Sequence, residues 1–191
     1  AGSAVSDKSL SEFAMENSIG GVEFLSCIPG TIGGGIKMNA GCFSREFKDI
    51  LISVQAINKS GQVVTIPVKD INFKYRDSGL PNDLIFLSAS FRGFKKNSNL
   101  IKNEMIKLKE KKEKAQPTRI KTSGSTFKNP LGQSDKKVWQ LIKESVSLEK
   151  SFGDACISDK HCNFFVNKGN AKFDDMKKLI EFVSESVLKK T

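Results

Sequence analysis

The most informative stretch of this sequence reads Pro29-Gly30-Thr31-Ile32-Gly33-Gly34-Gly35. Four glycines within six residues allow the backbone to adopt positive φ angles and to approach a ligand closely. Successive backbone N–H groups in such a segment can bind a phosphate or the polar edge of a ring. The spacing matches neither a Walker loop nor the dinucleotide pattern G-x-G-x-x-G. On spacing alone, the segment is either a turn or a ligand-binding loop.

The residues that follow this segment predict an antiparallel sheet. Runs rich in β-branched and aromatic residues occupy residues 50–57, 63–67 and 84–91. The sequence Lys59-Ser60-Gly61-Gln62 between the first two runs is typical of a hairpin turn. Because the predicted strands follow one another without helices between them, we expect an α+β fold and not a series of βαβ units.

Apolar residues at helical spacing predict helices on both sides of this sheet. An amphipathic helix over residues 7–17 is expected to carry Leu10, Phe13 and Ala14. A second helix is expected over residues 136–145 and a closing one over residues 174–188, capped by Asp174 or Asp175. The inward residues of the closing helix are expected to be Met176, Leu179, Ile180, Val183 and Val187. Between the helices, Ser123-Gly124-Ser125 reads as a turn and residues 155–166 as strand.

The positive charge is concentrated in one segment. The chain has 31 basic and 21 acidic residues, a net charge of +10, and residues 94–121 carry +7 of it. The basic residues there are Lys95, Lys96, Lys102, Lys107, Lys109, Lys111, Lys112, Lys114, Arg119 and Lys121. The segment predicts a helix capped by Ser98 or Asn99, with Ile101, Met105 and Leu108 as its apolar stripe. A solvated helix face is the favoured interpretation, and the scarcity of arginine and aromatic residues disfavours nucleic-acid binding.

Composition excludes several classes of protein. With 38% apolar and 27% charged residues the chain is typical of a globular protein, and no run of 18 apolar residues predicts a membrane span. The beginning of the chain has no signal-peptide pattern, so we expect none. Four dispersed cysteines and one histidine give no metal-binding spacing, so no metal is expected. The cysteines are expected to be reduced and buried, as in a cytoplasmic protein.

Five motifs, in order along the chain, resemble those of the UDP-N-acetylenolpyruvoylglucosamine reductase (MurB) family. The first is similar to its flavin-binding segment and comprises Glu23-Phe24-Leu25, then Ile28 to Gly35, then Met38-Asn39-Ala40-Gly41. The second, Tyr75-Arg76-Asp77-Ser78, is similar to Y-R-x-S. The others are Gln116-Pro117, Ser123-Gly124-Ser125-x-Phe127-Lys128-Asn129-Pro130, and Ser158-x-x-His161-Cys162-Asn163-Phe164 with Asn167-x-Gly169. Outside the resemblance, Arg76 beside Asp77 is typical of a surface ion pair and His161 of a hydrogen-bonded core histidine.

The resemblance implies a two-part architecture. Residues 1–115 would be the second subdomain, or C-terminal half, of a PCMH-type FAD-binding domain, an antiparallel sheet with helices. Residues 116–191 would be a smaller α+β substrate-binding domain, truncated at its end. The change in composition at Gln116-Pro117 supports a boundary there.

The resemblance also implies a cytoplasmic oxidoreductase of peptidoglycan precursor synthesis, and so of cell wall biogenesis, cell shape and cell division. NADPH would reduce FAD, which would pass a hydride to UDP-N-acetylenolpyruvoylglucosamine to give UDP-N-acetylmuramate. The alternatives are a non-catalytic UDP-sugar-binding remnant and a basic polyanion-binding module. A membrane partner is not expected, and the oligomeric state stays open.

The resemblance implies roles for particular residues. Ser125 would be the proton donor and Arg76 the group that stabilises charge on the substrate carboxylate. Tyr75, Lys128 and Asn129 would bind the substrate, and Lys128 or the end of the basic run would meet its diphosphate. The expected FAD-binding residues are Ile28, Pro29, Gly30, Thr31, Gly33, Gly34, Asn39 and Gly41.

The sequence departs from the family pattern in several places. Residues 1–191 contain neither the family's G-x-G-S-N phosphate loop nor its L-E-x-E-like segment with a catalytic glutamate, so this fragment alone is expected to be inactive. The family's Ala-Tyr/Phe-Gly after Asn-Ala-Gly reads Cys42-Phe43-Ser44 here. Three other expected glycines are Val146, Glu149 and Asp154, and each would be strained if its position required a positive φ.

Overall fold

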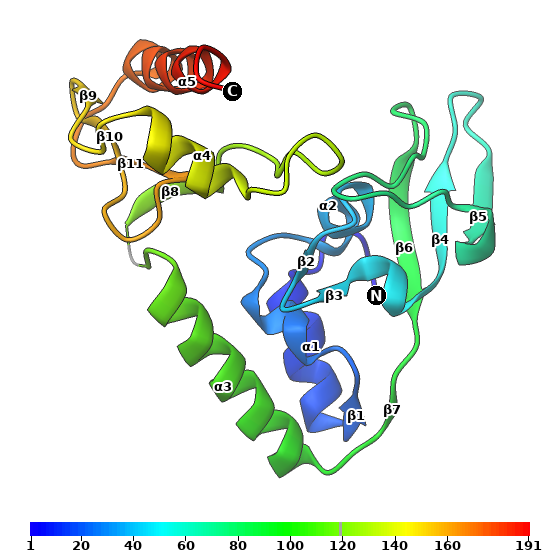
Figure 1. Ribbon diagram of the computed structural model, residues 1–191. Coiled ribbons are helices and arrows are strands. Elements are labelled where there is room, and N and C mark those ends of the chain that lie inside the picture. The colour runs from blue at the N-terminus through cyan, green and yellow to red at the C-terminus, as the bar shows by residue number, and fades with distance from the viewer. Residues whose placement is uncertain (119) are drawn as a thin grey trace. The chain divides into compact units, whose positions relative to one another are not determined.

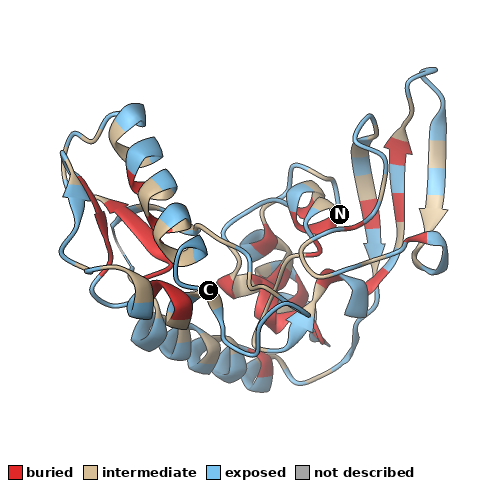
Figure 2. Cartoon of the chain, turned by 45° about the horizontal axis from the view of Figure 1, so that its top comes forward, coloured by how far each residue is buried: buried red, intermediate tan, exposed pale blue. Residues whose placement is uncertain are grey.

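The computed structural model describes residues 1–118 and 120–191, which form two compact units, Ala1–Lys112 and Glu113–Thr191 (Figure 1). Arg119, a member of the predicted basic run, lies outside the described residues. Each unit has its own buried core, visible as separate groups of buried residues in Figure 2.

The sheet of the first unit has the predicted antiparallel form. Strand β4 (Leu51–Ile57) lies between β5 (Val63–Pro67) and β6 (Ile85–Phe91), and both pairs are antiparallel. The predicted hairpin turn is confirmed, since Gly61 adopts a φ of +76° there. The side-chain Oδ1 of Asn58 accepts the N–H groups of Ser60 and Gln62, which closes the turn.

Short helices and paired strands complete this unit. The helices are α1 (Asp7–Glu16) and α2 (Ile32–Lys37), with 3-10 turns η1 (Glu23–Cys27), η2 (Phe47–Asp49) and η3 (Val68–Asp70). The paired strands are β1 (Ile19–Gly20) with β7 (Phe94–Lys95) and β2 (Gly41–Cys42) with β3 (Arg45–Glu46). The fully buried side chains at the centre of the core include Leu25, Ile32, Ile36, Phe47 and Val54.

One predicted core residue of α1 is wrong. Phe13 is 59% exposed, whereas Asp7, Ser11 and Ala14 are the buried residues of this helix. Positions 7, 11 and 14 form one stripe at spacings of four and three, and Phe13 lies about 100° away from Ala14 around the helix. The spacing therefore predicted the helix correctly, with Ala14 buried and Leu10 packed against the core, and was wrong only for Phe13.

The basic helix forms as predicted and is α3 (Ser98–Ala115). Its first turn is capped by Asn97 and not by Ser98 or Asn99, because the side-chain Oδ1 of Asn97 accepts the N–H groups of Asn99 and Leu100. Ile101 is buried, as expected of the apolar stripe. Lys112 donates to the carbonyl oxygen of Cys27 at 2.6 Å, so this lysine fastens α3 to η1.

The second unit is a four-stranded antiparallel sheet with two helices. The strand order is β8 (Lys121–Ser125), β11 (Phe164–Asn167), β10 (Ala155–Ile157) and β9 (Ser151–Phe152). Helices α4 (Val138–Ser145) and α5 (Phe173–Leu188) pack on this core through Ile142, Leu179 and Val183. The inward face predicted for the closing helix is confirmed. The N-cap of α5 is Lys172 and not Asp174 or Asp175, which lie in the first turn; Asp175 accepts the N–H of Lys172 at 2.9 Å.

Residues 123–125 are strand and not the turn we expected. The pairing of β8 with β11 shifts register between Phe164 and Val166, and Gly124 adopts a φ of +89°. A glycine at positive φ is typical of a β-bulge. The Ser-Gly-Ser pattern therefore marks an irregularity within a strand, where the sequence alone suggested that the chain reverses.

Backbone strain falls on different positions from those expected. Val146 has a φ of −134°, and neither Glu149 nor Asp154 is among the described residues with positive φ. The left-handed residues near the glycine segment are Asn39 at +39°, Phe43 at +51° and Ser44 at +63°. Ser44 thus stands in place of the family's glycine at a position where glycine would be less strained.

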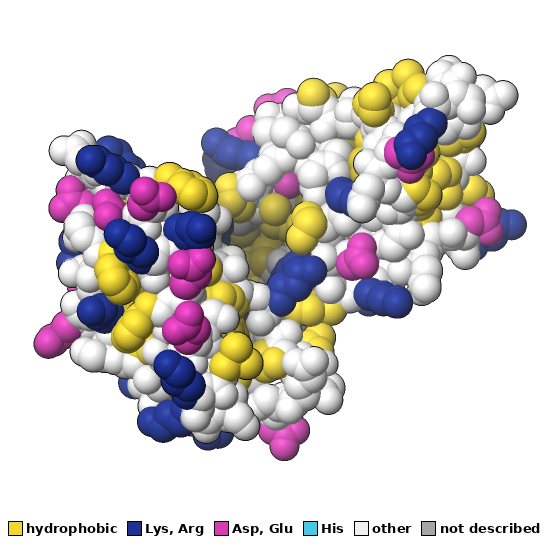
Figure 3. Space-filling model, turned by 90° about the horizontal axis from the view of Figure 1, so that it is seen from above, with side chains coloured by type: hydrophobic (Ala, Val, Ile, Leu, Met, Phe, Trp, Pro, Cys, Tyr) yellow, Lys and Arg dark blue, Asp and Glu magenta, His cyan; other side chains and the backbone are white. Residues whose placement is uncertain are grey.

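The surface shows where each kind of side chain is exposed. Apolar side chains are exposed on the three-stranded sheet, where yellow atoms gather at the right of Figure 3; they include Ile52, Val63, Ile85 and Leu87. Among the described residues, no helix combines the length and apolar character needed to cross a bilayer. The same residues contain no group of three His, Cys, Asp or Glu side chains arranged to hold a metal ion.

Candidate functional site

The glycine segment is an exposed turn followed directly by a helix. Pro29, Gly30 and Thr31 are exposed, and Thr31 caps α2 by accepting the N–H of Gly34. Gly33 and Gly34 lie within α2, and no glycine of the segment has a positive φ. The positive φ angles that glycine allows are therefore not used in this segment, and the glycines have another physical reason.

That reason is close packing. A Cβ on Gly35 would lie 2.2 Å from the Phe47 ring, and a Cβ on Gly33 would lie 3.1 Å from Ser3. Gly35 thus allows α2 to contact the ring of a fully buried phenylalanine. A Cβ on Gly34 would meet only Thr31 Oγ1, at an ordinary 3.6 Å. Of the predicted flavin-binding glycines, Gly30 and Gly34 are therefore exposed, whereas Gly33 faces protein.

A buried carboxylate lies beneath the turn. Asp7 has 0% exposure, and neither of its carboxylate oxygens has a hydrogen-bond partner among the residues that the structure describes. Its backbone N–H donates to the carbonyl oxygen of Gly30, and a Cβ on Gly30 would lie 3.2 Å from Asp7 Oδ2. Burial raises the pKa of Asp7 to about 6, because the charged form loses its hydration.

This burial gives the first unit a specific pH dependence. Asp7 is charged above about pH 6 when folded but already above its ordinary pKa of 3.8 when unfolded, so folded stability falls as pH rises between these values. We expect Asp7→Asn to raise the free energy of unfolding by up to about 3 kcal/mol near neutral pH. The gain should vanish towards pH 4, below which both states hold the proton. Urea unfolding at several pH values measures this difference.

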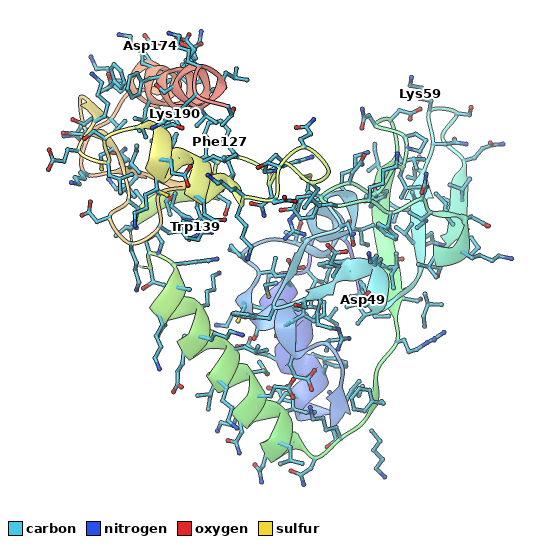
Figure 4. All side chains as sticks on the ribbon, viewed as in Figure 1. Asp49, Lys59, Phe127, Trp139, Asp174 and Lys190 are labelled. Atoms are coloured by element: carbon cyan, nitrogen blue, oxygen red, sulfur yellow. The ribbon has the colours of Figure 1, made fainter. Side chains whose placement is uncertain are left out.

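The matched control is Asp174→Asn, at an exposed carboxylate in the first turn of α5 (labelled in Figure 4). This change should lower stability slightly, because it removes a negative charge near a helix N-terminus. A destabilising effect of Asp7→Asn at neutral pH would show that the Asp7 carboxylate is solvated or paired in solution.

Asn39, Gly41 and Arg76 form one connected cluster. Asn39 is fully buried, and its Nδ2 group donates to Glu46 Oε2 and to the carbonyl oxygen of Lys74, each at 3.0 Å. Arg76 donates to the carbonyl oxygens of Asn39 at 3.2 Å and Gly41 at 3.0 Å. The structure therefore joins the two family motifs that the sequence separates by 35 residues.

Arg76 has a different ionic partner from the one its neighbours suggested. Its Nη1 lies 3.5 Å from Glu46 Oε1, whereas the simple interpretation paired it with Asp77. Its guanidinium also lies over the Tyr75 ring, 4.9 Å from the centroid. The sequence analysis missed Glu46, which links Asn39 to Arg76. No motif marks it, and only its position one residue before a buried aromatic, Phe47, distinguishes it.

Two cysteines meet beside the glycine turn. Cys27 at the end of η1 and Cys42 in β2 interact through their thiols, and none of the cysteines is in a disulfide. The interaction with Cys42, together with Ser26 and the charges of Lys112 and Lys109, lowers the pKa of Cys27 despite its burial. The expectation of buried, reduced cysteines holds for Cys27, while Cys42 is half-buried.

In the second unit, the predicted site residues lie at the end of β8 and in the segment that follows it. Ser125 is the last residue of β8, and Ser125 and Lys128 are exposed. Asn129 Oδ1 accepts the N–H of Val138 at 3.1 Å, so this side chain fastens that segment to the start of α4. Ser125, Lys128 and Asn129 thus belong to one unit, and Tyr75 and Arg76 to the other.

A cavity of about 300 Å³ in the second unit contains none of the predicted site residues. Trp139 of α4 (labelled in Figure 4), Lys143 and His161 are among its lining residues. Burial lowers the pKa of His161, whose Nδ1 accepts the N–H of Asn163 at 3.3 Å. The expectation of a hydrogen-bonded, partly buried histidine is confirmed.

Comparison with known proteins bears on both units. Residues 1–67 match the family model described as "FAD binding domain". Residues 116–191 match the model described as "UDP-N-acetylenolpyruvoylglucosamine reductase, C-terminal domain". The fold and these matches define an FAD-binding class of protein with a second, smaller α+β domain.

Individual relatives agree with the two models. The chain is 70% identical over its whole length to the UDP-N-acetylenolpyruvoylglucosamine reductase of Pelagibacter ubique, and 45% identical over 97% of its length to that of Rickettsia bellii. The crystal structure of the Thermus caldophilus reductase (MurB) matches 94% of the chain with a TM-score of 0.83 and 33% identity. The chain therefore belongs to the UDP-N-acetylenolpyruvoylglucosamine reductase (MurB) family.

The match covers only part of each relative. The chain spans 63% of the Pelagibacter protein, 61% of the Rickettsia protein and 65% of the Thermus chain. The predicted α+β class, with an antiparallel sheet and helices in an FAD-binding part followed by a smaller domain, is confirmed.

Proposed function

We propose that these residues carry part of the FAD site and part of the sugar-nucleotide site of a reductase. The reductase would convert UDP-N-acetylenolpyruvoylglucosamine to UDP-N-acetylmuramate with NADPH as the hydride donor. The supporting observation is the 70% identity, across all 191 residues, to a relative that bears the name of this reductase. A cytoplasmic role in peptidoglycan synthesis, and hence in cell wall biogenesis, cell shape and division, follows from the same proposal.

The division of labour follows the two units. We assign residues 1–115 to the FAD-binding domain and residues 116–191 to the substrate-binding domain. The exposed turn of Pro29, Gly30 and Thr31 suits a flavin nucleotide, since Gly30 presents backbone without a side chain and Thr31 adds a hydroxyl group. Ile28, Gly33, Gly34, Asn39 and Gly41 complete the proposed FAD-binding set. Asn39 contributes by holding the backbone of this region, because its side chain is buried and bonded.

FAD, when bound, supplies the hydride for the enolpyruvyl double bond. Hydride addition places negative charge on the substrate carboxylate, which a fixed guanidinium stabilises by about 3–4 kcal/mol. Arg76 is held for this role by the carbonyl oxygens of Asn39 and Gly41 and by Glu46, so its orientation is set before substrate binds. Tyr75, beside it, would contact the substrate.

The second unit would provide the proton. Ser125 is exposed at the end of β8 and would donate its hydroxyl proton to the adjacent carbon of the lactyl group. A serine hydroxyl is a weak acid, so it suffices only against a strongly basic carbon from which water is excluded. Lys128, in the segment between β8 and α4, would place a positive charge near the diphosphate. Asn129 attaches this segment to the start of α4.

The test uses the full-length protein. We expect it to purify yellow with bound FAD and to oxidise one NADPH per UDP-N-acetylenolpyruvoylglucosamine consumed. A colourless protein that does not oxidise NADPH with this substrate would contradict the proposal. The 191-residue chain alone is expected to give no turnover.

The two alternatives predict different results in the same assays. A UDP-sugar-binding remnant would bind the sugar nucleotide by calorimetry without turnover in the full-length protein. A polyanion-binding module would bind nucleic acid with a steep salt dependence and without competition from the UDP-sugar.

A further inference from the structure

Asn163 is a buried polar residue immediately before β11. It is 4% exposed, and its side chain makes two hydrogen bonds to one residue of another segment. Asn163 Oδ1 accepts the N–H of Phe127 at 3.0 Å, and Nδ2 donates to the Phe127 carbonyl oxygen at 2.9 Å. The amide therefore satisfies both backbone groups of Phe127, as a neighbouring antiparallel strand would.

The backbone of Asn163 extends the same attachment. Its carbonyl oxygen accepts the N–H of Thr126 at 2.8 Å, and the next residue, Phe164, pairs with Ser125. The two residues 163 and 164 thus hold the three consecutive residues 125 to 127. The Phe127 ring, labelled in Figure 4, also packs edge-on against Phe165 at 5.9 Å.

This attachment matters because the strand before it is irregular. Gly124 adopts a φ of +89°, and the pairing of β8 with β11 shifts register at this point. A bulge re-aims the side chains that follow it, and their direction then depends on what holds the backbone beyond the bulge. For Ser125, the groups that bond to the backbone beyond the bulge are the side-chain amide and the backbone carbonyl oxygen of Asn163.

The backbone N–H and C=O of Phe127 require a side chain at position 163 that is uncharged and carries one donor and one acceptor. An aspartate would place a second oxygen against the Phe127 carbonyl oxygen, and an alanine would leave the N–H and C=O of Phe127 without partners. A protonated aspartic acid, by contrast, again offers one donor and one acceptor. The substitution Asn163→Asp is therefore a switchable version of the native side chain.

We propose that Asn163 is the positioning residue that fixes the direction of the Ser125 hydroxyl for proton delivery to the sugar nucleotide. This inference rests on the proposed function, and it adds a residue to which the family resemblance assigned no role. Asn163 acts through the backbone of residues 125 to 127 and touches neither substrate nor flavin. Misplacement of a reacting group by about 1 Å lowers a rate by about 100-fold.

The test is Asn163→Asp in the full-length, FAD-loaded protein. At alkaline pH we expect kcat for sugar reduction to fall about 100-fold, with KM changed less than about threefold. Flavin reduction by NADPH should stay within about twofold of wild type, because this step needs no proton from Ser125. The ratio of variant to wild-type kcat should recover as pH falls and the buried carboxyl group takes up a proton.

Amide hydrogen exchange provides a readout that does not depend on activity. In the variant, the N–H groups of Thr126 and Phe127 should exchange faster at alkaline pH, while those at the β10–β11 pairing stay protected. This pattern separates local release of residues 125 to 127 from general unfolding.

The matched control is Asn167→Asp, four residues further along the chain. Asn167 uses only Oδ1, which accepts the N–H groups of Gly169 at 2.9 Å and Ala171 at 3.0 Å. A carboxylate keeps both bonds, so this variant should retain wild-type kcat without pH recovery.

The outcomes separate this inference from the proposed function. A wild-type protein without sugar reduction contradicts the proposed function. An active wild type overturns the role of Asn163 if the variant keeps full kcat, if its loss does not recover at low pH, or if exchange at Phe127 is unchanged. Loss at alkaline pH, recovery on acidification and local release together support it.

Discussion

Ser125→Ala in the full-length protein is expected to abolish sugar reduction while leaving flavin reduction by NADPH intact. The side chain sits exposed at the end of β8 and is the proposed proton donor. Loss of a positioned general acid lowers a rate by about 10²–10⁴-fold, and we expect the upper part of this range because no other proposed group supplies the proton. Stopped-flow measurement of flavin absorbance separates the two half-reactions.

The matched control for this variant is Ser123→Ala. Ser123 is also an exposed serine of β8, two residues before Ser125 and on the other side of the bulge at Gly124. It should keep both half-reactions within about twofold of wild type. Sugar reduction by Ser125→Ala at more than half the wild-type rate would exclude Ser125 as the proton donor.

Gly35→Ala is expected to give the largest loss of stability among changes in the glycine segment. The new methyl group would lie 2.2 Å from a ring atom of Phe47, whereas real Cβ atoms essentially never approach closer than 3.0 Å. The ring cannot move aside easily, because Phe47 is fully buried and packs edge-on against Phe91 at 6.0 Å. Overpacking of this kind costs about 3 kcal/mol, and the better helix propensity of alanine offsets about 1 kcal/mol.

The control lies in the same helix. Gly34→Ala meets only Thr31 Oγ1 at 3.6 Å, so it should be neutral or stabilise the chain by up to about 1 kcal/mol. Urea unfolding of the 191-residue chain measures both variants. Combining Gly35→Ala with Phe47→Leu, which removes the colliding ring atoms, should cost less than the sum of the single changes. Equal stability of the two alanine variants would contradict the packing role of Gly35.

Much of the fold follows from local patterns. Runs rich in β-branched and aromatic residues predicted β4, β5 and β6, and the Gly61 turn joined the first two, because strand and hairpin signals depend on neighbours in the chain. Helical spacing predicted α1, α3, α4 and α5 for the same reason. Several details were wrong. Phe13 faces outward, Asn97 and not Ser98 or Asn99 caps α3, and residues 123–125 continue a strand where we expected a turn.

The candidate site was likewise predictable in part from the sequence. The order of motifs along the chain identified the family and named Arg76 and Ser125, because motif order is a property of the sequence. It gave no indication of Glu46, which pairs with Arg76, or of the attachment of Phe127 by Asn163. It also predicted a turn or a ligand-binding loop for glycines that the structure places in α2 against Phe47 and Ser3.

The sequence by itself determined the family, the class of fold and the residue types at the proposed reacting positions. Only the tertiary structure showed which groups bond to those residues and where close packing in the glycine segment excludes a side chain. The physical reason is distance along the chain. Asn39 bonds to a carbonyl oxygen 35 residues away and Asn163 to a backbone 36 residues away. Patterns of near neighbours specify helices and strands, whereas the partners of buried polar groups are fixed only when distant segments pack together.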